Sequence, residues 1–256
     1  MHIKFESFRL FSTSFHFRSN SSTLRYFSKG RFLNMNQSSP HHTSSIEMLP
    51  IEIRQAILSA SPDLKCLHAL ALSCSSFYYP FASCASLIMT LVLSNEIGCG
   101  AFPEAMVAHE GYQIETWDEE NTLPFITNYF TSGTLQFRYL PINEVVEASQ
   151  FHKTVQYFTE DFIRTAFSKV PLENSSSPSE SEITRIKRSF YIFEIYYMFY
   201  RYDSIYEHRT LFPEFSPWEY EQIGCIHDYL IRALCPGRSP PSFPSRASIL
   251  TSLSSV

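Results

Sequence analysis

A helical segment between residues 179 and 203 places the strongest constraint on the fold. It carries eight aromatic residues from Phe190 to Tyr202. Large apolar side chains recur at helical spacing along one face of this helix: Ile183, Ile186, Phe190, Phe193 and Tyr197. Three further apolar residues fall on other faces: Tyr191, Ile195 and Tyr196. Because a helix that is apolar all round must be covered on all sides, we expect protein to surround it.

Glycine is scarce in this aromatic-rich chain. The 256 residues include 7 Gly against 23 Phe and 15 Tyr, and the sequence holds no Gly-rich loop of the kind that cradles phosphates. Few glycines disfavour a loop-rich scaffold, whereas many rings favour long elements that pack through them. The sequence therefore predicts a mainly α fold, in which an irregular helical domain over residues 101–235 has an aromatic-rich core.

Two short helical patterns open the segment 46–98. The first follows Leu49 and ends near Ala60, with a proline suited to its first position. The second starts at once, because the Ser61 hydroxyl can accept a bond from orphan amides and Asp63 suits the positive end of a helix. We expect Ser61 to be the cap of this second helix.

A third helix is expected over Phe81–Ile97. Its apolar face is wide, and Gly98 or Gly100 can end it in a left-handed conformation. The longest strongly apolar stretch, around Leu87–Leu93, is far shorter than the roughly 20 residues needed to cross a bilayer. No transmembrane segment is therefore expected.

The domain from residue 101 begins with a pattern that is hard to interpret. A short helical piece is expected near Glu104–His109, and the rest of 101–139 stays open between strand and loop. Helical periodicity returns over Val145–Phe158 and resumes after Thr159, a candidate cap. Residues 172–182 are rich in serine, which predicts a flexible surface loop inside the domain or a linker between two domains.

Two capping boxes mark the last two helices. Ser179 and Glu182 have the spacing of such a box, which predicts the start of the aromatic helix. The run Ser216-Pro217-Trp218-Glu219 adds a proline at the first helical position, and the helix that follows is expected to reach Leu234. We interpret Trp218 as a core anchor rather than as a platform for a ligand.

Both ends of the chain differ in composition from its body. Residues 1–45 carry six basic residues against the single acid Glu6, and Arg25-Tyr26-Phe27-Ser28 resembles the cleavage sites of mitochondrial presequences. The alternative is a disordered or wrongly assigned extension, with translation starting at Met35. Residues 236–256 are rich in Ser and Pro and are expected to form a disordered tail.

Cysteine usage and charge bear on compartment and partners. The six cysteines form no Cys-x-x-Cys pair, and most lie in apolar runs where a reduced thiol behaves as a small hydrophobe. We expect a reducing compartment, the cytoplasm or nucleus, with the mitochondrion as the alternative if residues 1–35 act as a presequence. Beyond residue 45 the chain is acidic, which argues against nucleic acid as a partner.

Possible chemical sites are weak. Cys225-Ile226-His227-Asp228 joins a thiol, an imidazole and a carboxylate, but helical residues two apart face different directions, so we expect a core Cys225 with His227 and Asp228 at the surface. The run Asp118-Glu119-Glu120 is typical of a solvated loop. We predict no catalytic residue, no metal and no cofactor, and hence a protein that is not an enzyme.

The segment 46–98 also resembles a known family. The resemblance rests on these residues: Leu49-Pro50-Ile51-Glu52-Ile53, Ile57-Leu58, Pro62-Asp63-Leu64, Leu67, Leu70, Leu72-Ser73-Cys74 and Phe77. They look like an F-box as found in many fungal proteins, over about a fifth of the chain. Arg185-Ile186-Lys187-Arg188 and the run from Phe215 to Gln222 resemble helices that follow the box in fungal F-box-like proteins.

This resemblance implies a three-helix F-box-like segment, followed by the irregular helical domain. An F-box binds the Skp-type adaptor of an SCF-type ubiquitin ligase, which joins it to the cullin complex, and the helical domain would present a client protein. The residues expected to contact the adaptor are apolar: Leu49, Pro50, Ile53, Ile57, Leu58 and Leu64. The alternative is a non-catalytic structural or interaction protein that keeps the segment as part of its own core. Exposure of Leu49, Pro50 and Ile53 would favour docking.

Overall fold

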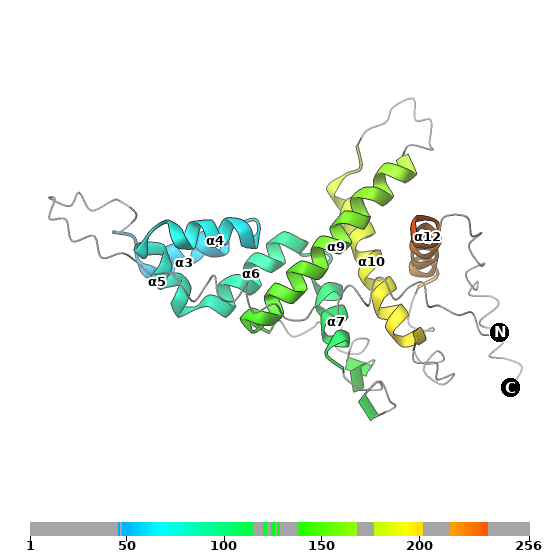
Figure 1. Ribbon diagram of the computed structural model, residues 1–256, viewed down its shortest axis with the longest axis horizontal. Helices are drawn as coiled ribbons and strands as arrows, with labels where there is room; N and C mark the ends of the chain where they lie inside the picture. The colour runs from blue at the N-terminus through cyan, green and yellow to red at the C-terminus, as the bar shows by residue number, and fades with distance from the viewer. Residues whose placement is uncertain are drawn as a thin grey trace, which may run out of the picture. The chain divides into compact units, whose positions relative to one another are not determined.

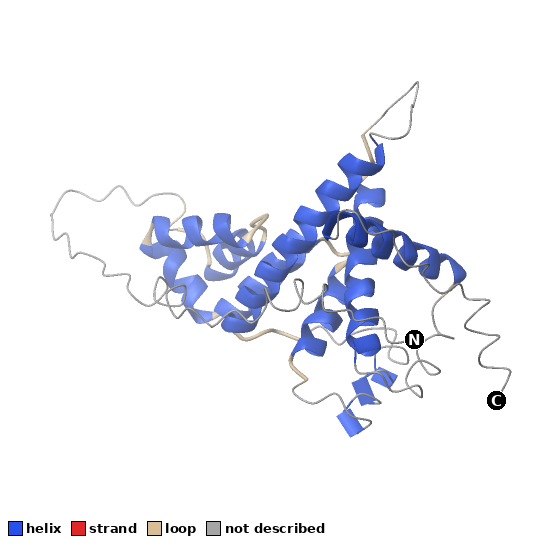
Figure 2. Cartoon of the chain, turned by 45° about the vertical axis from the view of Figure 1, so that its right-hand side comes forward, coloured by secondary structure: helices blue, strands red, loops and turns tan. Residues whose placement is uncertain are grey.

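The computed structural model describes only part of the chain (Figure 1). The described residues are 46, 48–114, 120–121, 124–125, 127–128, 138–167, 177–201 and 216–234. All regular elements in these ranges are helices, as Figure 2 shows, and the predicted mainly α fold is confirmed. Several predictions lie outside the described residues: those for 1–45, Asp118-Glu119, 131–137, 172–176 and 236–256.

The chain divides into two compact units. The first contains residues 1–98 and 138–151, and the second contains residues 99–137 and 152–256. The first unit thus joins the segment 46–98 to a stretch that we had expected in the helical domain.

Two short helices open the first unit, α3 (Ile51–Ser59) and α4 (Leu64–Ser73). The prediction that Ser61 caps α4 is wrong. The cap is Asp63, whose carboxylate accepts a hydrogen bond from the Cys66 amide at 2.6 Å. Ser61 is instead buried, and its carbonyl accepts from the Asn95 side chain at 3.1 Å. The negative charge of the Asp63 carboxylate also suits the positive end of the α4 dipole.

The predicted third helix is two helices, so this prediction is wrong. α5 (Ser75–Ser83) and α6 (Ala85–Ile97) meet at an angle of 96°. Cys84 breaks the path, with φ −139° and ψ 35°. No single helix among the described residues is long and apolar enough to cross a membrane; only the bent pair α5 and α6 meets that test together.

Helix α6 supplies the core of the first unit. Its buried side chains are Ile88, Met89, Thr90, Val92, Leu93 and Ile97. It ends at Gly98, one of the two glycines predicted for this end, where φ is +93°, a backbone conformation that side chains with a Cβ rarely adopt. The Thr90 hydroxyl accepts a hydrogen bond from the Leu140 amide at 3.0 Å, which attaches the chain before α9 (Ile142–Phe167) to α6.

The second unit contains α7 (Phe102–Tyr112), α10 (Glu180–Arg201), α12 (Pro217–Leu234) and the part of α9 from residue 152. Thr159 does not start a helix, so that prediction is wrong. It lies inside α9 and its hydroxyl donates to the Val155 carbonyl at 2.8 Å, a bond that a helix interior permits.

Both capping boxes are confirmed. Glu182 Oε2 accepts from the Ser179 amide at 2.8 Å, and the Glu182 amide donates to Ser179 Oγ at 3.3 Å. The same two bonds join Ser216 and Glu219, at 2.9 and 3.3 Å. Two orphan amides are thereby satisfied at the start of each helix.

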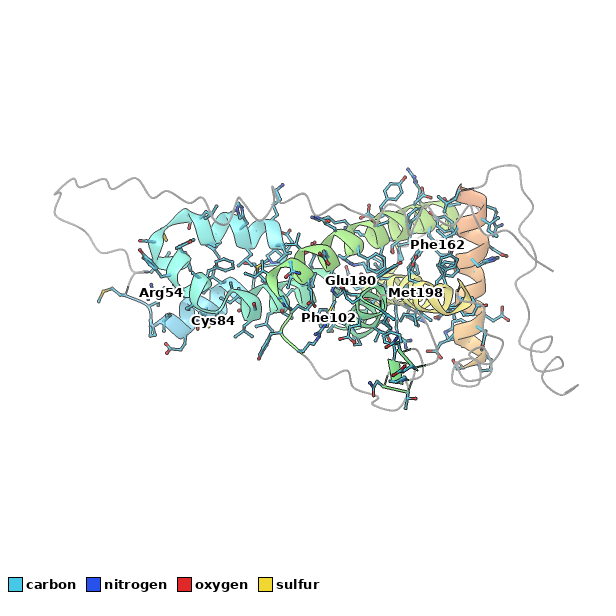
Figure 3. The ribbon with its side chains drawn as sticks, turned by 60° about the horizontal axis from the view of Figure 1, so that its bottom comes forward. Arg54, Cys84, Phe102, Phe162, Glu180 and Met198 are labelled. Carbon is cyan, nitrogen blue, oxygen red and sulfur yellow. The ribbon has the colours of Figure 1, made fainter. Side chains whose placement is uncertain are left out.

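Aromatic rings form the centre of the second unit, as predicted. Phe162 of α9 (labelled in Figure 3) meets Tyr229 of α12 edge to face with ring centroids 5.2 Å apart. Phe190 of α10 lies 6.1 Å from the same tyrosine ring and 6.3 Å from Phe162. Every residue of α10 from Ser189 to Tyr196 is buried, so this part of the helix is surrounded by protein.

Candidate interaction surface

A group of exposed apolar side chains lies at the start of the first unit. We call it the apolar strip, and its members are Ile46, Met48, Ile51, Ile53 and Ile57. Ile53 is 48% exposed and Ile57 is 38% exposed. A single exposed isoleucine is common, but apolar side chains that share one face of a helix, as Ile53 and Ile57 do, are typical of interaction sites.

The strip stays exposed because the opposite part of α3 is held by α5. Pro80 has no amide hydrogen, which leaves the Ser76 carbonyl without its helical donor. Arg54 Nη1 donates to this carbonyl at 2.9 Å. Gln55 Nε2 donates to the Pro80 carbonyl at 3.4 Å and to Ser83 Oγ at 3.1 Å. Polar side chains of α3 therefore complete the backbone hydrogen bonding around the proline of α5.

Leu58 completes the inward face of α3. It is 0% exposed, whereas Arg54 and Gln55 are half-buried and point to α5. At 100° per residue these three positions share one face, and Ile53 and Ile57, four residues apart, share another. The partly exposed Ile53 and Ile57 therefore lie on a different face of α3 from the three residues that point inward. Figure 3 labels Arg54, which holds α3 to α5, and Cys84, where the chain bends between α5 and α6.

The six residues predicted for adaptor contact differ in their exposure. Pro50, Ile53 and Ile57 are exposed, Leu49 and Leu64 are half-buried, and Leu58 is buried. Leu58 thus belongs to the core and is not available to a partner. The turn before α3 brings Leu49 to Ile46, with the Leu49 amide donating to the Ile46 carbonyl at 3.2 Å.

Sequence reasoning missed three members of the strip: Ile46, Met48 and Ile51. All three flank the Leu49-Pro50 entry. One signal could have found them. Apolar residues stand on both sides of the predicted start of a short helix, and a helix of this length has too few residues to cover them all.

The prediction of a core Cys225 and a surface His227 is wrong, whereas the side chain of Asp228 is 40% exposed. Cys225 is exposed and His227 is buried, with its Nδ1 3.2 Å from Asp228 Oδ1. Burial lowers the pKa of His227, and partial desolvation of the thiol, together with nearby carboxylates, raises the pKa of Cys225. A thiol with a raised pKa is a poor nucleophile near neutral pH. Across the described ranges, no group of three or more His, Cys, Asp or Glu could hold a metal ion.

Trp218 is 64% exposed, so the prediction of a core anchor is also wrong. The capping box fixes the first turn of α12, and the residues that turn into the core are Tyr220 and Ile223. Trp218 precedes these two residues in the first turn of α12, where Ser216 and Pro217 are exposed as well.

Comparisons with known proteins give no relative. A scan against models of protein families finds no match, and searches of the curated proteins and of the solved structures find none either.

Proposed function

We propose that this protein is a non-catalytic substrate adaptor of an SCF-type ubiquitin ligase, in which the segment 46–98 binds a Skp-type adaptor. The observation that carries the proposal is that Ile53 and Ile57 are 48% and 38% exposed on one face of α3, while Leu58 on another face is buried. The resemblance of this segment to an F-box names the partner, and the exposure supplies a surface that such a partner would cover.

The chemistry of the apolar strip suits a helical partner with an apolar groove. Full burial of an exposed isoleucine side chain contributes roughly 1.5–3 kcal/mol, and the exposed parts of Ile53 and Ile57 would each add a share of that. Side chains four residues apart on one helix are the usual anchors for binding in a groove. Because Arg54, Gln55 and Leu58 already fix α3, little conformational entropy would be lost when the partner binds.

The cullin complex would then join through the Skp-type adaptor, and the second unit would present the client protein. The alternative function is a structural or interaction protein whose segment 46–98 serves only its own core. Buried Leu58 and Leu67 are required by both functions. The two differ only in what the apolar strip binds.

The test is a binding measurement with a purified Skp-type adaptor. The variant Ile53→Glu/Ile57→Lys replaces two members of the strip by charges that suit the helix dipole and can pair four residues apart, so α3 should keep its fold. We expect wild-type chain to bind and this variant to lose at least about tenfold in affinity.

Tyr139→Glu is the matched control, since Tyr139 is an exposed aromatic residue in the same unit but outside the segment 46–98. It should bind like wild type. Circular dichroism must show the same helix content for all three chains. Absence of binding by wild type, or equal binding by the strip variant, would contradict the proposal and favour the structural alternative.

An adaptor of this kind would act in the cytoplasm or nucleus. The mitochondrial alternative rests on residues 1–35, which lie outside the described residues. A fluorescent fusion of residues 1–45 tests it: import of the fusion into mitochondria would argue against a cytoplasmic or nuclear adaptor.

A further inference from the structure

A buried carboxyl group joins two helices of the second unit. Glu194 of α10 is 1% exposed, and its Oε2 accepts a hydrogen bond from the Tyr112 hydroxyl at 2.6 Å. Tyr112 is the last residue of α7, which lies beside α10 (Figure 1). The two residues are 82 positions apart, so their bond ties together distant parts of the chain.

The surroundings of this carboxyl group do not suit a negative charge. Glu194 Oε1 is buried and no described residue donates a hydrogen bond to it. A buried carboxylate usually needs a cation or several donors, because desolvation of the charge is costly. Among the described residues, one hydroxyl serves a group that can accept about four hydrogen bonds when ionised.

Close packing continues along this contact. A Cβ added at Gly111 would lie 2.8 Å from Met198 Cε, on the next turn of α10 after Glu194. Met198 is labelled in Figure 3. Because α7 and α10 approach this closely, a charge that draws water to Glu194 would have to separate the two helices.

We propose that the Glu194–Tyr112 pair is a proton-dependent clasp between α7 and α10. While the Glu194 carboxyl group is protonated, it and the tyrosine hydroxyl share a hydrogen bond between neutral groups and the helices stay together. When the proton leaves to solvent, the carboxylate is left with too few donors and the C-terminal end of α7 loosens from α10.

The titration range supports this mechanism. Burial raises the pKa of Glu194 from 4.5 to about 7, although the Tyr112 hydrogen bond lowers it. The folded-state pKa is thus above the unfolded value, so the stabilising contribution is fully present below pH 4.5 and is lost as pH rises through 7. A shift of this size corresponds to a change of up to about 300-fold in the equilibrium between packed and open forms.

Other titratable groups face the same helix. His109 and Glu110 lie on α7, His152 of α9 has its Nδ1 2.7 Å from the Tyr191 hydroxyl, and His227 of α12 contacts Phe193. Burial lowers the pKa of His227, so its titration stabilises the fold as pH rises, which is the opposite sign. Arg188, nearly two turns before Glu194, donates to Glu104 and Glu219. A variant at position 194 separates the clasp from all of these groups.

The experiment is hydrogen exchange of the full chain at about pH 5.5 and about pH 8, corrected for the intrinsic pH dependence of exchange. We expect amides of α7 in wild type to open at least about tenfold more at the higher pH. Glu194→Gln, which cannot ionise, should show no such change, and amides of α6 in the other unit should behave alike in both chains. The same pH response in wild type and Glu194→Gln would overturn the proposal.

A second measurement, the titration of the carboxyl group itself, does not require Glu194→Gln to fold. Infrared titration of wild type should show a protonated carboxyl group that persists to near pH 7. Tyr112→Phe removes the hydrogen bond that lowers the pKa of Glu194, so the midpoint should move upward. Loss of all protonated carboxyl signal by about pH 5.5 in wild type would overturn the proposal whatever the variants do.

Discussion

Arg188 Nε donates to Glu104 Oε1 at 2.7 Å, so a cation of α10 lies against a nearly buried carboxylate of α7. Nη2 of the same guanidinium group reaches Glu219 Oε1 of α12 at 3.3 Å. One arginine therefore serves carboxylates on two other helices. We expect Arg188→Met to lower the free energy of unfolding by about 1–3 kcal/mol, because Glu104 would keep its charge without a partner. Urea denaturation at neutral pH measures this loss.

Arg185 offers the matched control, since it is exposed and one turn away on the same helix. Arg185→Met should change the free energy of unfolding by less than about 0.5 kcal/mol. Adding Glu104→Gln to Arg188→Met should recover part of the loss, because the unpaired charge is then gone. Equal losses for Arg185→Met and Arg188→Met would show that the ion pairs contribute nothing specific.

The capping box of α12 predicts a loss at Ser216. Ser216→Ala removes the hydroxyl that accepts from the Glu219 amide, and we expect the free energy of unfolding to fall by about 1 kcal/mol. Ser216→Asn keeps an acceptor at the cap and should stay within a few tenths of a kcal/mol of wild type. Thermal or urea unfolding of the three chains decides this. If the Asn variant lost as much as the Ala variant, the cap bond would not be the cause.

Leu58 and Ile53 lie on different faces of α3, and substitution by alanine should separate their roles. Leu58→Ala leaves a cavity in the core and should cost about 2–4 kcal/mol of unfolding free energy. Ile53→Ala removes a side chain that is 48% exposed and should cost less than about 1 kcal/mol. Urea denaturation compares them directly. Similar losses would mean that Ile53 is packed in the protein and that the apolar strip is part of the core.

Local signals in the sequence predicted three helix ends, although the caps expected at Ser61 and Thr159 are wrong. The Ser179–Glu182 and Ser216–Glu219 boxes and Gly98 depend on interactions within a few residues, so their spacing was sufficient. The break at Cys84 was not predictable in this way, because apolar periodicity continues through Phe81–Ile97 without a visible interruption. The break is stabilised by bonds from Gln55 of a different helix.

The direction of single side chains was harder to predict. The sequence predicts Trp218 in the core, and it predicts His227 at the surface because His227 lies two helical positions from Cys225. In the structure Trp218 is exposed and His227 is buried. The buried face of α12 is set by the aromatic residues of α9 and α10 that pack on Tyr229. For the candidate surface, the F-box resemblance nominated Ile53 and Ile57, but only the packing of α3 on α5 separates them from Leu58.

A last prediction concerns the contact of α12 with α9. The Tyr229 hydroxyl donates to Asp161 Oδ2 at 2.6 Å, and Arg164 pairs with Asp161 Oδ1. These two bonds hold the pKa of Asp161 below its usual value of 3.8. Tyr229→Phe keeps the ring that packs on Phe162 and removes the hydroxyl, so the pKa of Asp161 should rise. A side-chain carboxyl titration by NMR measures it, with Tyr157→Phe as the control because Tyr157 is exposed on α9.

The same variant should change the response to acid. The folded-state pKa of Asp161 is depressed, so its stabilising contribution is present above pH 3.8 and is lost as pH falls further. Wild type should therefore lose stability more steeply than Tyr229→Phe on acidification in this range. If the pKa of Asp161 were the same in both chains, the Tyr229 bond would not be what stabilises its charge, and the α9–α12 contact would depend on ring packing alone.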